Sequence, residues 1–94
     1  MIKVRFCENE IVVEGHANFD EYGKDIVCAA VSSIVQYAAY ILKLNGAEFE
    51  KREGFLKIYN IKDDDCSKKT IFVLKEALMD IKKKFPKHLE LEVK

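Results

Sequence analysis

Residues 25–44 read DIVCAAVSSIVQYAAYILKL and form the longest apolar stretch of the 94-residue chain. Its apolar residues recur at the three- and four-residue spacing of a helix, and a second apolar set widens that face around the axis. Asp25 is a good N-cap, because its carboxylate can accept hydrogen bonds from the first turn, and Asn45-Gly46 is a plausible stop. We therefore predict one long helix covered on more than one side, with a second subunit as one candidate cover.

Alternating apolar and polar residues predict strands on both sides of this helix. A second helix with one apolar face stops before Pro86. The predicted strands cover residues 2–6, 11–14, 48–52, 55–61 and 89–94, and the second helix covers 67–84. The order ββαββαβ predicts an α+β fold. We expect a single two-layer domain over residues 1–94, a mostly antiparallel sheet with two helices mainly on one face.

The charge balance and the N-terminus narrow the class of protein. Sixteen basic and sixteen acidic side chains give a formal net charge of zero, which argues weakly against a dedicated nucleic-acid binder. The N-terminus lacks the long apolar run of a signal peptide. Ser32, Ser33, Gln36 and Lys43 interrupt residues 26–44, which therefore indicate a buried helix rather than a membrane span.

The chain has three cysteines, Cys7, Cys28 and Cys66. Their odd number and wide spacing do not suggest a disulfide framework, and with two histidines they complete no obvious zinc site. We expect a cytoplasmic protein that holds no metal and no cofactor. Cys7 and Cys66 have a less favourable helix-start context than Cys28 and are interpreted as incidental thiols.

The segment that can carry chemistry joins His16, just past a predicted strand, to Cys28 in the first turn of the long helix. A helix start offers free N–H groups and a partial positive charge, and both favour a nucleophilic thiolate. A nearby imidazole could act as base and later as acid, and the N–H groups could stabilise an oxyanion. On the residues alone, a buried cysteine on an apolar helix is the commoner situation, and this alternative stays open.

The pattern Gly15-His16-Ala17, followed by GKDIVCAAVS over residues 23–32, resembles the signature of the ribosomal-processing cysteine proteases of bacteria. The order of strands and helices along the rest of the chain agrees with that family. The resemblance implies an endopeptidase that removes an N-terminal extension from a large-subunit ribosomal protein, number twenty-seven in the bacterial series, during ribosome maturation. It also implies a homodimer that requires neither a membrane nor direct contact with nucleic acid.

Carried over residue by residue, the resemblance makes Cys28 the nucleophile and His16 the general base of a dyad. The loop from Ala17 to Lys24 would close over the substrate, with Gly15 and Gly23 as hinges. Two further residues keep alternative roles. Asp25 caps the helix or orients another group, and Ser32 lines the cleft or bonds back to its own helix. The alternative function is a ribosome-associated binding or assembly factor without catalysis.

Overall fold

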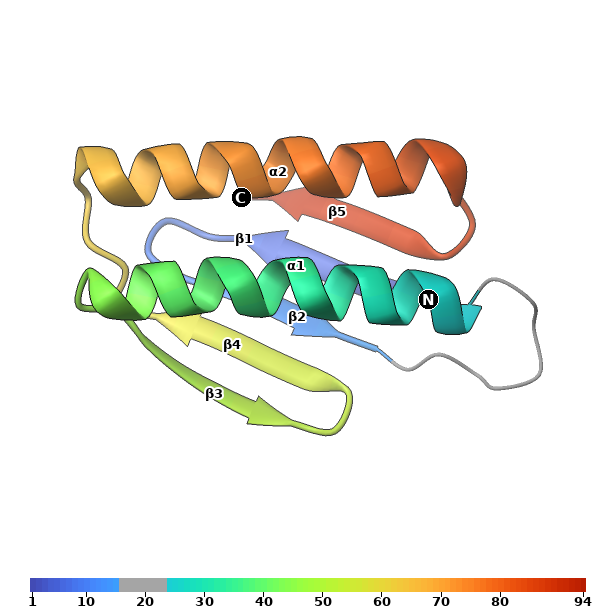
Figure 1. Ribbon diagram of the computed structural model, residues 1–94, viewed down its shortest axis with the longest axis horizontal. Helices are drawn as coiled ribbons and strands as arrows, with labels where there is room; N and C mark the ends of the chain where they lie inside the picture. The colour runs from blue at the N-terminus through green and yellow to red at the C-terminus, as the bar shows by residue number, and fades with distance from the viewer. Residues whose placement is uncertain (16–23) are drawn as a thin grey trace.

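The computed structural model describes residues 1–15 and 24–94, and the backbone alone for Lys24 and Asp25. In these ranges the elements follow the predicted order ββαββαβ. The strands form one sheet, in the order β3-β4-β2-β1-β5, and Figure 1 shows both helices side by side in a layer on one face. The bounds are β1 Ile2–Phe6, β2 Ile11–Glu14, α1 Lys24–Leu44, β3 Glu48–Arg52, β4 Phe55–Tyr59, α2 Asp65–Lys84 and β5 Leu89–Val93.

The sheet is mixed, because β1 and β5 pair in parallel while the other neighbouring strands pair antiparallel. The register places Val4 of β1 opposite Val13 of β2 and Leu91 of β5. This row belongs to the apolar face under the helices, where Val4 is fully buried. Charged residues occupy the other face, including an Arg5–Glu14 ion pair. The predicted two-layer α+β architecture is confirmed.

Helix α1 is apolar on two sides. The side facing the sheet is buried and consists of Val27, Val31, Val35, Ala38, Ala39 and Leu42. On the remaining surface Ile26, Tyr37, Tyr40 and Leu44 are exposed. By length and composition alone Ile26–Leu44 could also cross a membrane, and 33% of that stretch is buried within the chain. The second apolar side predicted from the sequence therefore exists, and it is largely exposed, with Tyr40 contacting Phe49 of β3 at its margin.

The other elements depart little from prediction. Helix α2 begins at Asp65, two residues early, because Asp64 is its N-cap and accepts a hydrogen bond from the Ser67 N–H. Strand β4 ends at Tyr59 instead of residue 61. Asn60 follows it with a φ of 56°, a left-handed conformation that a strand cannot continue through.

Candidate active site

Cys28 is the fifth residue of α1, which begins at Lys24. The predicted cap at Asp25 is wrong, because Asp25 lies within the first helical turn rather than before it. Cys28 is consequently at the start of the second turn, slightly deeper than predicted. Helical side chains lean toward the N-terminus of their helix, so the thiol still lies over the first turn and its free N–H groups. Cys28 is half-buried and packs against the core.

A cavity of about 170 Å³ opens beside Cys28. It lies between the first half of α1, the start of β1, the end of β2 and the β3–β4 hairpin. Three of the predicted site residues line it together, namely Gly15, Cys28 and Ser32. The fold therefore brings the end of a strand, the start of a helix and a hairpin to one hollow at the candidate nucleophile.

Gly15 connects this hollow to two neighbouring segments. Its N–H donates to the carbonyl oxygen of Gly54 at 3.0 Å, which fastens the end of β2 to the tip of the β3–β4 hairpin. Its φ is 127°, and a Cβ at this position would overlap the carbonyl oxygen of Met1. A side chain is excluded here on both grounds, so the glycine is a structural requirement. Its predicted hinge role stays a prediction.

The β3–β4 hairpin supplies the wall opposite α1. Lys51, Arg52, Glu53 and the turn residue Gly54 line the cavity from this side. The Arg52 guanidinium lies 4.4 Å from the centre of the Phe55 ring, which also lines the cavity. Sequence reasoning did not find these residues, because nothing in a local pattern says which helix face a hairpin will approach.

A chain of hydrogen bonds runs from the hairpin to α1 along this wall. Lys51 Nζ donates to Gln36 Oε1 at 2.9 Å, and Gln36 Nε2 donates to Ser32 Oγ at 2.8 Å. All three side chains line the cavity that Cys28 lines. Cys28, Ser32 and Gln36 are spaced four residues apart, a polar stripe on an otherwise apolar helix. That spacing was the sequence signal that could have placed Gln36 on the same helix face as Cys28.

Ser32 was predicted either to line the cleft or to bond back to its own helix, and Thr70 shows what the second of these contacts looks like in this protein. Thr70 Oγ1 bonds back to the carbonyl oxygen of Cys66, four residues earlier, at 2.8 Å. Ser32 makes no such bond to the carbonyl of Cys28 within the described structure, and it lines the cavity. The geometry thus favours the cleft-lining role of Ser32.

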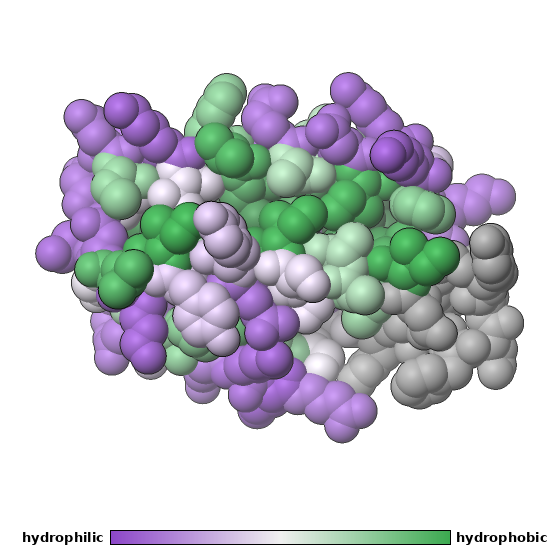
Figure 2. All heavy atoms as spheres, in the orientation of Figure 1, coloured by the Kyte–Doolittle hydropathy of each residue, from purple (hydrophilic) through white to green (hydrophobic). Residues whose placement is uncertain are grey.

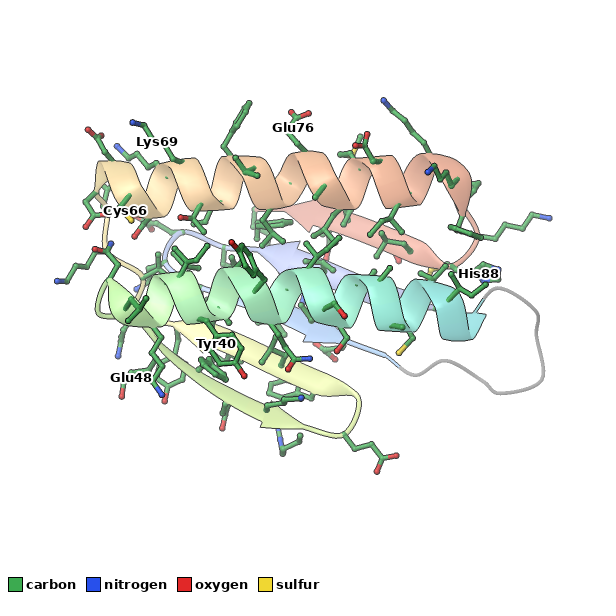
Figure 3. All side chains as sticks on the ribbon, viewed as in Figure 1. Tyr40, Glu48, Cys66, Lys69, Glu76 and His88 are labelled. Atoms are coloured by element: carbon green, nitrogen blue, oxygen red, sulfur yellow. The ribbon has the colours of Figure 1, made fainter. Side chains whose placement is uncertain are left out.

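The remaining predicted residues are not brought together at the cavity within the described structure. His16, Ala17 and Gly23 lie outside the described residues, as does the side chain of Asp25. Cys66 is exposed and is the second residue of α2. Its interpretation as an incidental thiol stays a prediction. It lies at the end of the molecule opposite the N-terminus of α1 (Figure 3).

His88, in the turn between α2 and β5, lies at the same end of the molecule as the N-terminus of α1 (Figure 3). It is outside the lining of the Cys28 cavity. Its Nδ1 is buried, and among the described residues that atom has no hydrogen-bond partner. His88 as a whole is half-buried.

A family model described as cysteine protease Prp matches residues 1–90. This chain belongs to the Prp family. The ribosomal processing cysteine proteases Prp of Mycoplasma genitalium and Mycoplasma pneumoniae are 57% and 49% identical to it, each over 35 residues. Each match covers 37% of this chain and 35% of the relative, so it spans about a third of either relative's length.

Solved Prp structures share the whole fold. The ribosomal processing protease Prp of S. aureus in complex with a substrate peptide superposes with a TM-score of 0.88 at 20% identity, over all of both chains. The same S. aureus protease with a covalently linked product peptide gives 0.84 at 20% identity, again over all of both chains. A Streptococcus mutans protein gives 0.79 at 22% identity, over 99% of this chain and 93% of its own. At these identities the likeness establishes the fold.

Proposed function

We propose that this protein is a cysteine endopeptidase with Cys28 as its nucleophile. The observation that carries the proposal is the position of Cys28 near the start of α1, in the lining of a cavity, in a chain of the Prp family. A cysteine that served only as a small hydrophobe would need no hollow beside it. The first-turn N–H groups also lie at the same place as donors for a developing oxyanion.

In the proposed reaction His16 takes the proton of the Cys28 thiol, and the thiolate attacks the carbonyl carbon of the scissile peptide. The tetrahedral intermediate collapses as the C–N bond breaks, and His16 returns the proton to the leaving amine. Water then attacks the thioester, releasing the new carboxyl group and restoring the thiol. The role of His16 rests on the signature resemblance, because residue 16 lies outside the described structure.

We further propose that the substrate is the precursor of large-subunit ribosomal protein twenty-seven, from which the enzyme removes an N-terminal extension in the cytoplasm. The names of the two mycoplasma relatives support a ribosomal substrate class. The cavity wall supports an extension that ends in hydrophobic and aromatic residues, because Val31, Val35, Phe55 and Leu56 all line it. Neither a membrane nor a nucleic acid is required for this reaction.

We also propose that the protein works as a homodimer, joined through the outer side of the helix layer. A groove of about 640 Å³ runs between α1 and α2, and Tyr37, Ile41 and Val73 are among the residues that line it. Figure 2 shows hydrophobic residues gathered over the two helices, with hydrophilic residues along both margins. A zero net charge leaves no long-range repulsion between two copies, and a two-fold contact pairs such a patch with itself.

The test is a cleavage assay with the full-length ribosomal protein precursor, read by intact mass. Wild type should produce one new N-terminus, and Cys28→Ala and His16→Ala should each abolish it. The chain contains two histidines, so His88→Ala is the matched control and should keep cleavage. A folded wild-type dimer that does not cleave would support the non-catalytic binding factor, and cleavage by Cys28→Ala would mean another nucleophile.

A further inference from the structure

The hydrogen bonds from Lys51 to Ser32 have a fixed direction. A lysine ammonium carries only donors, so the Gln36 atom facing it must be the amide oxygen Oε1. That contact orients the whole amide and turns Nε2 toward Ser32. An amide nitrogen also carries only donors, so Ser32 Oγ must be the acceptor. Lys51 therefore determines the role of a hydroxyl that it does not touch.

An accepting hydroxyl still has its own hydrogen to donate. Within the described residues the Ser32 hydrogen has no acceptor, whereas Thr70 directs its hydrogen to the carbonyl of Cys66. Ser32 lines the cavity one helical turn after Cys28. Because helical side chains lean toward the N-terminus, the Ser32 hydroxyl is directed toward the turn that carries Cys28. The free O–H hydrogen is thus available to whatever is bound over the thiol.

We propose that Lys51 and Gln36 are positioning residues that hold the Ser32 hydroxyl with its hydrogen directed into the Cys28 cavity, as a donor to the oxygen of the attacked carbonyl. This rests on the proposed protease function. When the Cys28 sulfur bonds to the carbonyl carbon, the oxygen gains negative charge. A donor already in place stabilises that charge without reorganisation during the reaction. Ser32 then adds to the first-turn N–H groups of α1.

The decisive variant is Gln36→Glu, which keeps the shape of the side chain and reverses one hydrogen bond. An ionised carboxylate only accepts, so it takes a bond from Lys51 and draws the Ser32 hydrogen away from the cavity. We expect kcat on the precursor to fall by about 100-fold with KM nearly unchanged, the lower end of the loss for an oxyanion donor. Ser32→Ala should show the same kcat loss. Glu50→Gln, an exposed change next to Lys51 that lies outside the lining of both the cavity and the groove, should behave as wild type.

Two comparisons separate positioning from a structural effect. Adding Gln36→Glu to Ser32→Ala should cause no further loss, because both changes remove the same donor. Lys51→Arg keeps a cationic donor and should retain a nearly normal kcat, whereas Lys51→Met should lower kcat several-fold. Lys51 is exposed on an edge strand, so both of its variants should fold, which thermal unfolding would verify.

The outcomes distinguish this inference from the proposed function. An inactive wild type would overturn the protease assignment and with it the proposed positioning of Ser32 by Lys51 and Gln36. An active wild type with an equally active Gln36→Glu variant would overturn the proposed positioning of Ser32 alone. Additive losses in the Ser32→Ala, Gln36→Glu double variant would also overturn it, because the two residues would then act separately.

Discussion

Asn45, at the end of α1, donates its side-chain amide to Asp64, the N-cap of α2, with Nδ2 lying 3.0 Å from each carboxylate oxygen. The same nitrogen lies 3.0 Å from the buried Ser67 Oγ. The Ser67 N–H in turn donates to Asp64 Oδ1 at 2.9 Å. One small cluster thus joins the end of the first helix to the beginning of the second. The Ser67 backbone bond first, and the Asn45 bond second, hold the pKa of Asp64 below its usual range.

The lowered pKa predicts an acid-dependent loss of stability. A carboxylate with a depressed folded pKa stabilises the fold fully above its unfolded pKa of about 3.9, and the contribution is lost as pH falls through the folded pKa. Asp64→Asn keeps a cap acceptor and removes the titration. We expect it to lower the thermal midpoint at neutral pH and to flatten the pH dependence below about pH 4.

Asp63→Asn is the matched control, because Asp63 is a highly exposed neighbour whose contact with Lys68 is at the surface. Circular dichroism melts of the three proteins across this pH range make the comparison. If Asp64→Asn kept the full wild-type pH dependence, the Asn45–Asp64–Ser67 cluster would not be its source.

The contact of Gly15 with Met1 predicts a large effect of a single methyl group. Gly15→Ala adds a Cβ that overlaps the Met1 carbonyl at a φ of 127°. We expect the free energy of unfolding to fall by at least about 1–3 kcal/mol, the cost of a strained backbone, and cleavage to be impaired because β2 leads directly to His16. Urea unfolding and the precursor assay measure the two effects.

Gly46→Ala is the comparison for this variant. Gly46 also has a positive φ, of 100°, but its added Cβ would meet only the flexible side chain of Lys62, at 2.9 Å from Cε. Gly46 is also absent from the lining of the Cys28 cavity. It should therefore lose less stability and keep its cleavage rate. Equal losses in both variants would show that the Met1 contact is not the cause.

The two sides of α1 predict opposite outcomes for two leucines that are close in sequence. Leu42 is 0% exposed against the sheet, and Leu44 is 91% exposed. Leu42→Ala should lower the free energy of unfolding by about 2–5 kcal/mol, the range for a buried leucine. Leu44→Ala should change it by no more than about 0.5 kcal/mol. Similar values from chemical denaturation would contradict the assigned orientation of α1.

The proposed dimer predicts that one charge in the helix groove separates the subunits. Val73 lines the groove and is 62% exposed, and its neighbour Phe72 is 63% exposed outside the groove lining. Val73→Asp should shift the mass in light scattering from dimer to monomer, because the carboxylate would be buried without a partner. Phe72→Asp should remain dimeric. A monomeric wild type would reject the dimer, and a dimeric Val73→Asp would place the interface elsewhere.

Much of this fold was predictable because its signals are local. Alternation located the first and last strands, short apolar runs beside turn residues located the others, and the three-four spacing of Leu74 and Leu78 identified the buried face of α2. The long apolar helix was also predicted, including its two apolar sides. The errors are at the ends of elements, where one local feature determines the boundary. The Asp64 cap hydrogen bond determines where α2 begins, and the left-handed backbone of Asn60 determines where β4 ends. That the whole chain is one functional domain stays a prediction.

The site was predictable only in part. The signature indicated Gly15, Cys28 and Ser32, and the structure brings these three to one cavity. Lys51 could not be assigned, because its contact with Gln36 depends on how the hairpin packs across fifteen residues of sequence. The direction of the Gln36 amide likewise follows only from a three-dimensional neighbour. Pairing of His16 with Cys28 stays a prediction.

The 21 residues of helix α1 form three surfaces, one against the sheet, one in the cavity wall and one in the groove. Val31 and Val35 pack on the sheet, Ser32 lines the cavity, and Ser33 and Ile34 line the groove. Adjacent positions therefore answer to different selective pressures, and few of them are free to drift. In a saturation-mutagenesis survey this helix should be the least tolerant segment of the chain, while the charged outer face of the sheet accepts wide variation.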